Sequence, residues 1–184
     1  AHTLIEQIEH LSKIASEFSQ FANIGNARLE DFDLHELIHS LVSLHSMQEH
    51  GEVHWAPLDQ RLMVRADKTQ INRLFTNLLQ NAYEAVPEGR EKVIRVREKL
   101  LGDHVVIMVQ DNGTGIPADT QAKIFIPNFT TKTSGTGLGL AMSKGIVEQA
   151  RGEIWFETSE DHGTTFFVSL PLLPVGGSSL AVRS

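Results

Sequence analysis

The stretch that most constrains the fold of this chain is VVIMVQDNGTGI, residues 105–116. Its apolar half predicts a buried strand, which delivers Asp111 to its end, and Asn-Gly-Thr-Gly follows. One interpretation is an ordinary turn, since Asp, Asn and Gly are common turn residues. The other is a binding site, because a carboxylate at a strand end can accept a hydrogen bond from an exocyclic amine, and Gly113 and Gly115 let the backbone approach a flat ring closely.

Two amides mark the helix that precedes this strand. Asn77 and Asn81 are four residues apart in NRLFTNLLQNAYEA, where most other positions are apolar. Residues four apart share one helix face, so two amides on a mostly buried helix need polar partners. Those partners are either neighbouring backbone groups or a bound ligand.

Two further motifs follow the strand. IFIPNFTTKTS carries two phenylalanines around a proline and then Thr130, Thr131 and Lys132, which is typical of a lid hinged on an aromatic anchor. GTGLGL, residues 135–140, opens a predicted helix. Glycines at a helix start expose N–H groups at the positive end of the helix dipole, where anions bind. The motif is neither a Walker loop nor a strand-led dinucleotide fingerprint.

Together the four motifs contain the parts of an ATP site. A carboxylate can accept a hydrogen bond from the amine of a base, and amides can coordinate Mg²⁺. A lid together with a helix N-terminus can bind phosphates. Mg²⁺ usually takes few protein oxygens because phosphates supply other ligands, so one asparagine carbonyl is enough. The sequence therefore predicts a domain that binds Mg²⁺ and ATP.

The remaining patterns predict an α+β fold. Asp33 is the expected N-cap of one helix, with Glu36 in the capping-box position, and Asp67 with Gln70 caps a second helix that runs to about Val86. Short strands are expected in EVHWAPL and RLMVRA, and hairpins in KVIRVREKLLGDHVVIMVQ and GEIWFETSEDHGTTFFVSLPL. Helices and strands mix without strict βαβ alternation, which favours the α+β class.

The first 26 residues predict an amphipathic helix. Its apolar positions step by four and three: Leu4, Ile8, Leu11, Ala15, Phe18 and Ala22. A seven-residue repeat over about three heptads suits a coiled coil or a helical bundle. The helix packs either on its own domain or, in the interpretation that we favour, on partners outside this chain, in a second copy or in upstream sequence.

The stretch HELIHSLVSLH raises the question of zinc. His35 and His39 share a helix face, and His45 follows, but the zinc-peptidase pattern needs a glycine turn where this chain has Val42. On a continuous helix His45 lies roughly 9 Å along the axis from His39 and ~120° around it. Three imidazoles so placed cannot share one tetrahedral ion. We interpret them as surface histidines on an amphipathic helix whose buried stripe includes Leu44.

Composition narrows the class of protein further. The net charge of −7 and the absence of a Lys/Arg-rich block argue against nucleic acid as a main partner. No apolar run approaches the roughly 18 residues of a membrane span, and no signal peptide is visible. We expect a cytoplasmic location, with membrane attachment only through missing upstream segments. The absence of cysteine removes disulfides and thiolate metal sites.

In order and spacing, the motifs resemble those of the catalytic ATP-binding domain of two-component sensor histidine kinases. These kinases belong to the Bergerat-fold superfamily with DNA gyrase, mismatch-repair ATPases and the large heat-shock chaperone. Residues 77–84 match the asparagine box, 111–115 the first glycine box, 125–129 the phenylalanine box, 135–140 the second glycine box, and Gly163-Thr164 a late Gly-Thr pair. The lid sequence is similar to that of the nitrogen-regulation type of sensor kinase.

The resemblance implies a fold and a domain organisation. We expect a two-layer α/β sandwich with a mixed, mainly antiparallel sheet and three helices on one face, preceded by a long N-terminal helix. Residues 1–27 would be part of the second helix of the dimerisation and phosphotransfer hairpin, 28–174 the catalytic ATP-binding domain and 175–184 a flexible tail.

The resemblance also implies an activity, that of a protein-histidine kinase. The domain would bind ATP or ADP and Mg²⁺, and the intact homodimer would transfer the γ-phosphoryl group to a histidine and then to an aspartate of a response-regulator receiver domain. The implied ATP-binding residues are Asn77, Asn81, Glu84, Asp111, Gly113, Gly115, Ile116, Phe129, Thr130, Thr131, Lys132, Gly135, Thr136, Gly137, Leu138, Gly139 and Thr164.

Individual roles are implied at some of these positions. Asp111 would bind the adenine amine, with the Thr164 hydroxyl behind it. Asn81 would ligate Mg²⁺, and Asn77 would support that site. Lys132 and the N–H groups near Gly137 and Gly139 would contact phosphates.

Two departures from the family pattern stand out. Glu84 occupies a position where many of these kinases carry lysine, so either Lys132 carries more of the phosphate neutralisation or Glu84 aids the metal through water. His35-Glu36 is the available His-acid pair, yet it follows the presumed second hairpin helix, while His2 and His10 do not precede an acid. We therefore expect that this chain lacks its phosphoacceptor and binds ATP without autophosphorylation.

Three rival functions remain. A Bergerat-type ATPase with ATP-gated dimerisation tends to place a glutamate base four residues before the metal asparagine, where this chain has Asn77. A degenerate, non-catalytic signalling module is disfavoured by the intact Asp111 and glycine boxes, although Glu84 leaves room for it. A zinc peptidase comes last.

Overall fold

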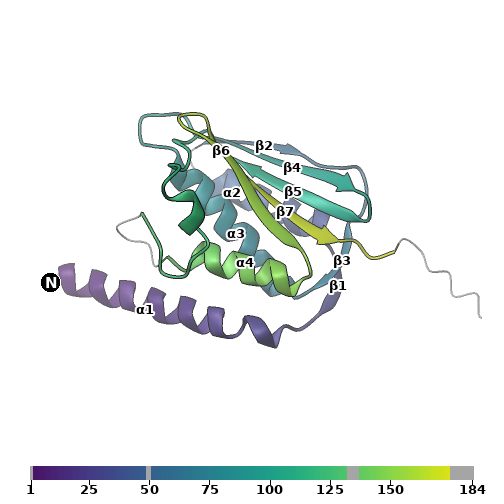
Figure 1. Ribbon diagram of the computed structural model, residues 1–184, viewed down its shortest axis with the longest axis horizontal. Helices are drawn as coiled ribbons and strands as arrows, with labels where there is room; N and C mark the ends of the chain where they lie inside the picture. The colour runs from purple at the N-terminus through teal and green to yellow at the C-terminus, as the bar shows by residue number, and fades with distance from the viewer. Residues whose placement is uncertain (1, 49–50, 132–136, 175–184) are drawn as a thin grey trace, which may run out of the picture.

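The computed structural model describes residues 2–48, 51–131 and 137–174 as a two-layer α/β sandwich with a long helix beside it (Figure 1). The main sheet has five strands in the order β2-β4-β5-β7-β6. Their bounds are β2 Glu52–Ala56, β4 Val93–Leu101, β5 His104–Gln110, β6 Glu153–Ser159 and β7 Gly163–Pro171. Only β2 and β4 pair in parallel, so the expected mixed, mainly antiparallel sheet is confirmed.

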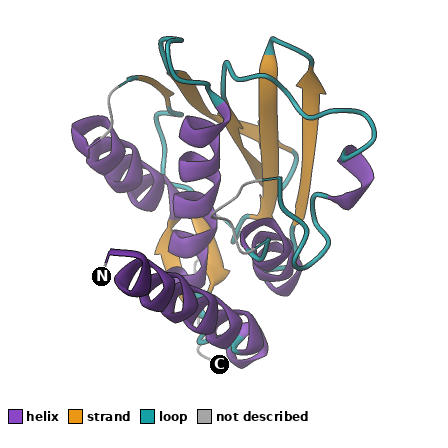
Figure 2. Ribbon diagram, turned by 90° about the vertical axis from the view of Figure 1, so that its left-hand side faces the viewer, coloured by secondary structure: helices purple, strands orange, loops and turns teal. Residues whose placement is uncertain are grey.

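Helices α2, α3 and α4 cover one face of this sheet (Figure 2). They span α2 Leu34–Gln48, α3 Lys68–Ala85 and α4 Gly139–Gln149. Leu74 and Leu78 of α3 are buried with Ile107 of β5 and Val168 of β7, because apolar positions recur at helix spacing on α3 and at every second residue of the strands. The expected N-cap also forms, since the Asp67 side chain accepts a hydrogen bond from the Gln70 nitrogen at 3.1 Å.

A small second sheet was missed by the sequence analysis. Strand β1 (Glu30–Asp33) pairs antiparallel with β3 (Met63–Ala66), and Phe32 faces Val64 in that pairing. The segment EDFD is acidic and offers one buried apolar residue, so its strand is stabilised by the pairing with β3 rather than by its own pattern. Asp33 then caps α2 as expected, because its Oδ1 accepts from the His35 nitrogen at 3.0 Å.

Helix α1 (His2–Ala22) exposes its apolar stripe, and a short 3₁₀ helix, η1 (Ile24–Asn26), follows it. Leu4, Ile8 and Leu11 are 66, 59 and 65 % exposed. At the end of the segment, Phe21 and Ile24 pack against the core. The alternative of a helix packed along its own domain is therefore wrong for most of α1.

The histidines of α2 do not share a site. His39 is exposed, whereas His45 is buried, with its Nδ1 3.0 Å from the Leu41 carbonyl oxygen and its ring stacked on Tyr83. The prediction of a surface position was thus wrong for His45, and Leu44, expected in the buried stripe, is exposed because the stripe turns toward His45 at the end of the helix. Among the described residues, no group of three His, Cys, Asp or Glu side chains could hold a metal ion.

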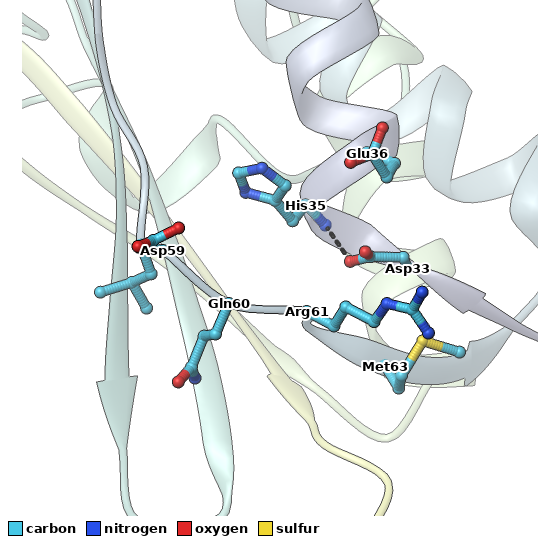
Figure 3. Close-up of a pocket in the computed structure, with 8 residues that line it drawn as sticks. Asp33, His35, Glu36, Asp59, Gln60, Arg61 and Met63 are labelled. Carbon is cyan, nitrogen blue, oxygen red and sulfur yellow. Dashed lines mark hydrogen bonds between the residues drawn. The ribbon is translucent and has the colours of Figure 1, made fainter.

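His35 joins α2 to the sheet instead. Its Nδ1 lies 3.0 Å from Oε2 of Glu98, a carboxylate whose side chain is fully buried and which also accepts from the Leu58 nitrogen at 2.9 Å. The imidazole borders an open cavity of about 540 Å³ beside the loop that follows β2 (Figure 3). The hydrogen bond to Glu98 raises the pKa of His35 above its ordinary value, and the nearby charges of Asp33 and Glu36 act in the same direction.

This pair predicts a pH-dependent contribution to stability. Because the folded-state pKa of His35 is raised, its contribution is complete below the unfolded pKa of about 6.5 and is lost as the pH rises through the folded pKa. We expect His35→Gln to lower the free energy of unfolding by about 1 kcal/mol at pH 5.5, less than a fully buried charged hydrogen bond would give. Urea titrations at pH 5.5 and 9 measure the difference, which should shrink at the higher pH.

The control is His54→Gln, since His54 makes an exposed pair with Glu52 on the same sheet. A pH-independent loss in His35→Gln, or an equal loss in both variants, would contradict the assignment.

Candidate nucleotide site

The site is built around Asp111, the residue that directly follows β5. It is 4 % exposed, and its Oδ1 accepts hydrogen bonds from the Gly113 nitrogen at 2.8 Å and from the Thr164 nitrogen at 3.2 Å. Both hydrogen bonds that described residues make with this carboxylate go to Oδ1. The second oxygen, Oδ2, therefore has acceptor capacity for a donor from outside the chain.

Burial sets the electrostatics of this carboxylate. Removal from water raises the pKa of Asp111 above its ordinary value, and the two N–H donors from Gly113 and Thr164 partly offset that effect. A buried carboxylate with one oxygen that receives no hydrogen bond from the described residues favours a ligand that brings a hydrogen-bond donor.

The first glycine box is held between α3 and the β6–β7 turn. The Thr114 nitrogen donates to the carbonyl oxygen of Ala85 at 3.4 Å, and the Asp161 nitrogen donates to the Thr114 carbonyl oxygen at 2.9 Å. The Ile116 nitrogen donates to Thr158 Oγ1 at 2.9 Å. Residues 111–116 thus leave β5 as an anchored segment and not as a free turn.

Thr164 supports the carboxylate of Asp111 in a different way from that expected. Its peptide nitrogen, rather than its hydroxyl, contacts Asp111, and the hydroxyl lies 2.9 Å from Thr158 Oγ1. Thr158 was missed by the sequence analysis because a threonine in an amphipathic strand gives no signal of its own. It links Thr164 to the backbone of the glycine box.

Asn77 connects the asparagine box to the second glycine box. Its Nδ2 donates to Ser143 Oγ at 3.0 Å, and that hydroxyl donates to the Gly139 carbonyl oxygen at 2.8 Å. Ser143, fully buried on α4, was also missed, although a serine within an apolar helix face is a usable signal. Asn81 lies one turn further along α3, partly buried, and Glu84 beyond it is exposed.

The base of the lid is closed by backbone contacts. The Asn128 nitrogen donates to the Gly137 carbonyl oxygen at 2.8 Å, and Gly137 has a φ of +71° that a Cβ-bearing residue rarely adopts. Phe125 packs on Phe156 and Phe166. Leu138 is buried beside this base.

Some expected lid residues lie outside the described part of the chain. These are Lys132, Gly135 and Thr136. Thr130 and Thr131 are described and exposed, and Phe129 is partly buried against the core. The 540 Å³ cavity lies at the opposite end of the sheet, because β2 and β4 run antiparallel to β5.

The fold and this arrangement define a class of ATPase domain. Residues 66–174 match the model of the histidine kinase-, DNA gyrase B-, and HSP90-like ATPase family, and the chain belongs to that family. This match accords with the four motifs in their order along the chain.

Individual relatives narrow the class to sensor kinases. The chain is 33 % identical over 177 residues to the sensor histidine kinase ZraS of Salmonella typhimurium, covering 94 % of this chain and 38 % of ZraS. It is 32 % identical over 157 residues to the nitrogen regulation protein NtrY of Azorhizobium caulinodans, covering 83 % of this chain and 20 % of NtrY. The chain thus spans well under half of the length of each of these two relatives. The similarity to NtrY confirms the predicted resemblance to nitrogen-regulation kinases.

A solved structure agrees with the fold. The catalytic domain of the histidine kinase ThkA superposes with a TM-score of 0.71 at 34 % identity, covering 79 % of this chain and 96 % of that one. ThkA in complex with the response regulator TrrA superposes with a TM-score of 0.76 at 27 % identity, covering 94 % of this chain and 50 % of that one. Within residues 2–48, 51–131 and 137–174, no helix combines the length and apolarity of a membrane span.

Proposed function

We propose that this chain is the Mg-ATP-binding catalytic part of a sensor histidine kinase. The observation that carries the proposal is the hydrogen bonding of Asp111. The peptide N–H groups of Gly113 and Thr164 donate to Oδ1, and Oδ2 can accept a hydrogen bond from a ligand. A buried carboxylate of this kind selects a ligand that donates a hydrogen bond, such as the exocyclic amine of adenine. Membership of the ATPase family supports ATP as that ligand.

Magnesium is the finer part of the proposal. Asn81 would give one side-chain oxygen to Mg²⁺, with phosphates and water as the other ligands. Asn77 acts through α4, since its contact with Ser143 fixes the helix start that would receive phosphates. Glu84 would either contact the metal through a water molecule or take no part in the site. In the second case Lys132 would neutralise more of the phosphate charge. Bound Mg²⁺ would neutralise phosphate charge during transfer of the γ-phosphoryl group.

The activity of the whole protein is part of the same proposal. The chain would position ATP for transfer to a histidine, and the relay to an aspartate of a response-regulator receiver domain is supported by the relatives' names. Hydrolysis as the main activity has less support, because Asn77 is bonded to Ser143 where related ATPases place a glutamate base. The need for ATP favours the cytosol as the location.

We infer the domain organisation from the exposure of α1. Residues 1–27 would belong to the dimerisation and phosphotransfer hairpin and residues 28–174 to the catalytic domain, with 175–184 as a tail. The exposed stripe of Leu4, Ile8 and Leu11 supports this division, since a contiguous apolar surface on one helix needs a partner. A homodimer, or the missing helix of the hairpin, would supply it.

Calorimetric titration of ADP and ATP with and without Mg²⁺ tests the proposal. The wild-type chain should bind both nucleotides, with ATP bound more tightly when Mg²⁺ is present. Asn81→Ala should remove that enhancement, about tenfold in Kd for one lost ligand, and leave metal-free ADP binding almost unchanged.

The matched control is Asn72→Ala, because Asn72 is an exposed amide on the same helix. It should retain the Mg²⁺ effect. No heat with either nucleotide in the wild-type chain would reject the kinase proposal and leave the degenerate signalling module.

A further inference from the structure

The outer face of the main sheet, the face opposite α2, α3 and α4, has an organised surface. On β4 the side chains of Ile94, Val96 and Glu98 are buried under the helices, so the alternate residues point outward. The cross-strand register joins these outward positions into rows across the sheet. One row runs through Ala56, Arg97, Met108, Phe167 and Trp155, and its neighbour through His54, Arg95, Gln110, Thr165 and Glu157.

The centre of this outer face is apolar and aromatic. Trp155 and Phe167 lie opposite each other on β6 and β7 and stack with ring centroids 5.2 Å apart and planes 2° apart. Met108 of β5 is the next residue of the row, and all three are partly exposed. A sheet face open to water is ordinarily polar, so this aromatic row has the composition of a binding surface.

Charge is distributed unevenly around the aromatic row. Arg95, Arg97 and Lys99 stand side by side on β4, all exposed, and within the described residues none of them has an ion-pair partner. Glu153 and Glu157 are exposed on β6 at the other side of the row, and Glu52 of β2 is exposed on the same face and pairs with His54. The β4 side is therefore a local positive stripe on a chain of net charge −7.

We infer that this outer face docks an acidic peptide segment of a partner protein that carries an aromatic or aliphatic anchor. The anchor would lie against Trp155 and Phe167, and its carboxylates would meet the stripe of Arg95, Arg97 and Lys99. Arg97, Phe167 and Trp155 lie in one row, and arginine and aromatic side chains are enriched at the centres of protein interfaces. Charge complementarity of this kind raises association rates and selects acidic partners.

The size of the face favours a segment over a second copy of the chain. Five strands at ~4.8 Å spacing and about six residues at ~3.4 Å give roughly 400 Å². A standard interface buries about 800 Å² on each partner, so this face suits a transient contact. Nucleic acid is disfavoured because the lysines and arginines of the face number three and three exposed glutamates, Glu52, Glu153 and Glu157, lie on the same face.

A peptide-display selection tests the inference. The probe is a random library of 12-residue peptides selected on the wild-type chain, with Arg95→Glu/Arg97→Glu as counter-selection. Enriched peptides should be net acidic and contain an aromatic residue. The matched control is Lys13→Glu/Lys68→Glu, which makes the same charge change at exposed lysines on α1 and α3 and should retain the enrichment.

The most enriched peptide is then synthesised and titrated into a Trp55→Phe variant, so that Trp155 is the remaining tryptophan. Saturable change in Trp155 emission is expected, with at least a tenfold weaker Kd when Arg95→Glu/Arg97→Glu is added. Enrichment without acidic bias, or an unchanged Trp155 signal, would overturn the inference. So would tighter binding of single-stranded RNA, or self-association of the chain through this face. ATP titration in the same variants separates this result from the nucleotide proposal, which does not involve the outer face.

Discussion

Asp111→Asn is expected to weaken adenine-nucleotide binding strongly while the fold is retained. In the variant the carbonyl oxygen can still accept from Gly113 and Thr164, which places the new NH₂ group where Oδ2 stands. An amine of adenine would then meet a donor in place of an acceptor. The lost charged hydrogen bond is worth about 3 kcal/mol at most, and that corresponds to roughly 100-fold in Kd. Calorimetric titration of ADP measures this loss directly.

The same substitution should stabilise the folded chain at neutral pH. Burial raises the folded-state pKa of Asp111, so the stability linked to its protonated form is complete below the unfolded pKa of about 3.9 and is lost as the pH rises through the folded pKa. The neutral amide of the variant would escape that loss. The variant should therefore be more stable than the wild type at pH 7, with the gap closing as the pH falls toward 4.

The control is Asp103→Asn, an exposed carboxylate bonded to His104 at the far end of the same strand. It should leave ADP binding unchanged. Retained ADP affinity in Asp111→Asn would remove the basis of the proposed function. Lost affinity together with lower stability would mean that Asp111 acts as a structural residue.

The sequence predicted well what depends on local pattern. The strand that ends at Asp111, the helix capped by Asp67 and both hairpins follow from periodicity and turn chemistry, and all are present. The order of the four motifs identified the class of domain before any geometry was known, and the family match agrees. Spacing along the chain was sufficient because the first glycine box follows the end of β5, the second leads into α4, and Asn77 on α3 contacts Ser143 of α4.

What the sequence did not predict depends on contacts between distant segments. Strand β1 exists through its pairing with β3, and His45 is buried because Tyr83 of α3 covers its ring. Thr158 reaches the glycine box only because the β6–β7 turn folds over residues 111–116. The Thr164 hydroxyl turns toward Thr158 for the same reason. None of these contacts produces a periodic pattern of residue types in the sequence.

The β6–β7 turn contains a glycine, Gly163, whose substitution should have a large effect on stability. Gly163 begins β7 with a φ of +100°, and a Cβ at this position would overlap the carbonyl oxygen of Asp111. Gly163→Ala should therefore destabilise the chain in two ways, through strain at positive φ and through displacement of the backbone behind Asp111. We expect a loss of about 4 kcal/mol in the free energy of unfolding, which is at the large end for a single substitution. Urea unfolding measures it.

Gly89→Ala separates the two causes, since Gly89 has a similar φ of +88° but no atom within 4 Å of a Cβ. It carries the strain alone and should lose about 1 kcal/mol without a change in ADP binding. Gly163→Ala should also weaken ADP binding, because the carboxylate of Asp111 moves with its backbone. Equal losses in the two variants would mean that the turn yields without displacing Asp111. The close contact between Gly163 and the backbone of Asp111 would then have no part in forming the site.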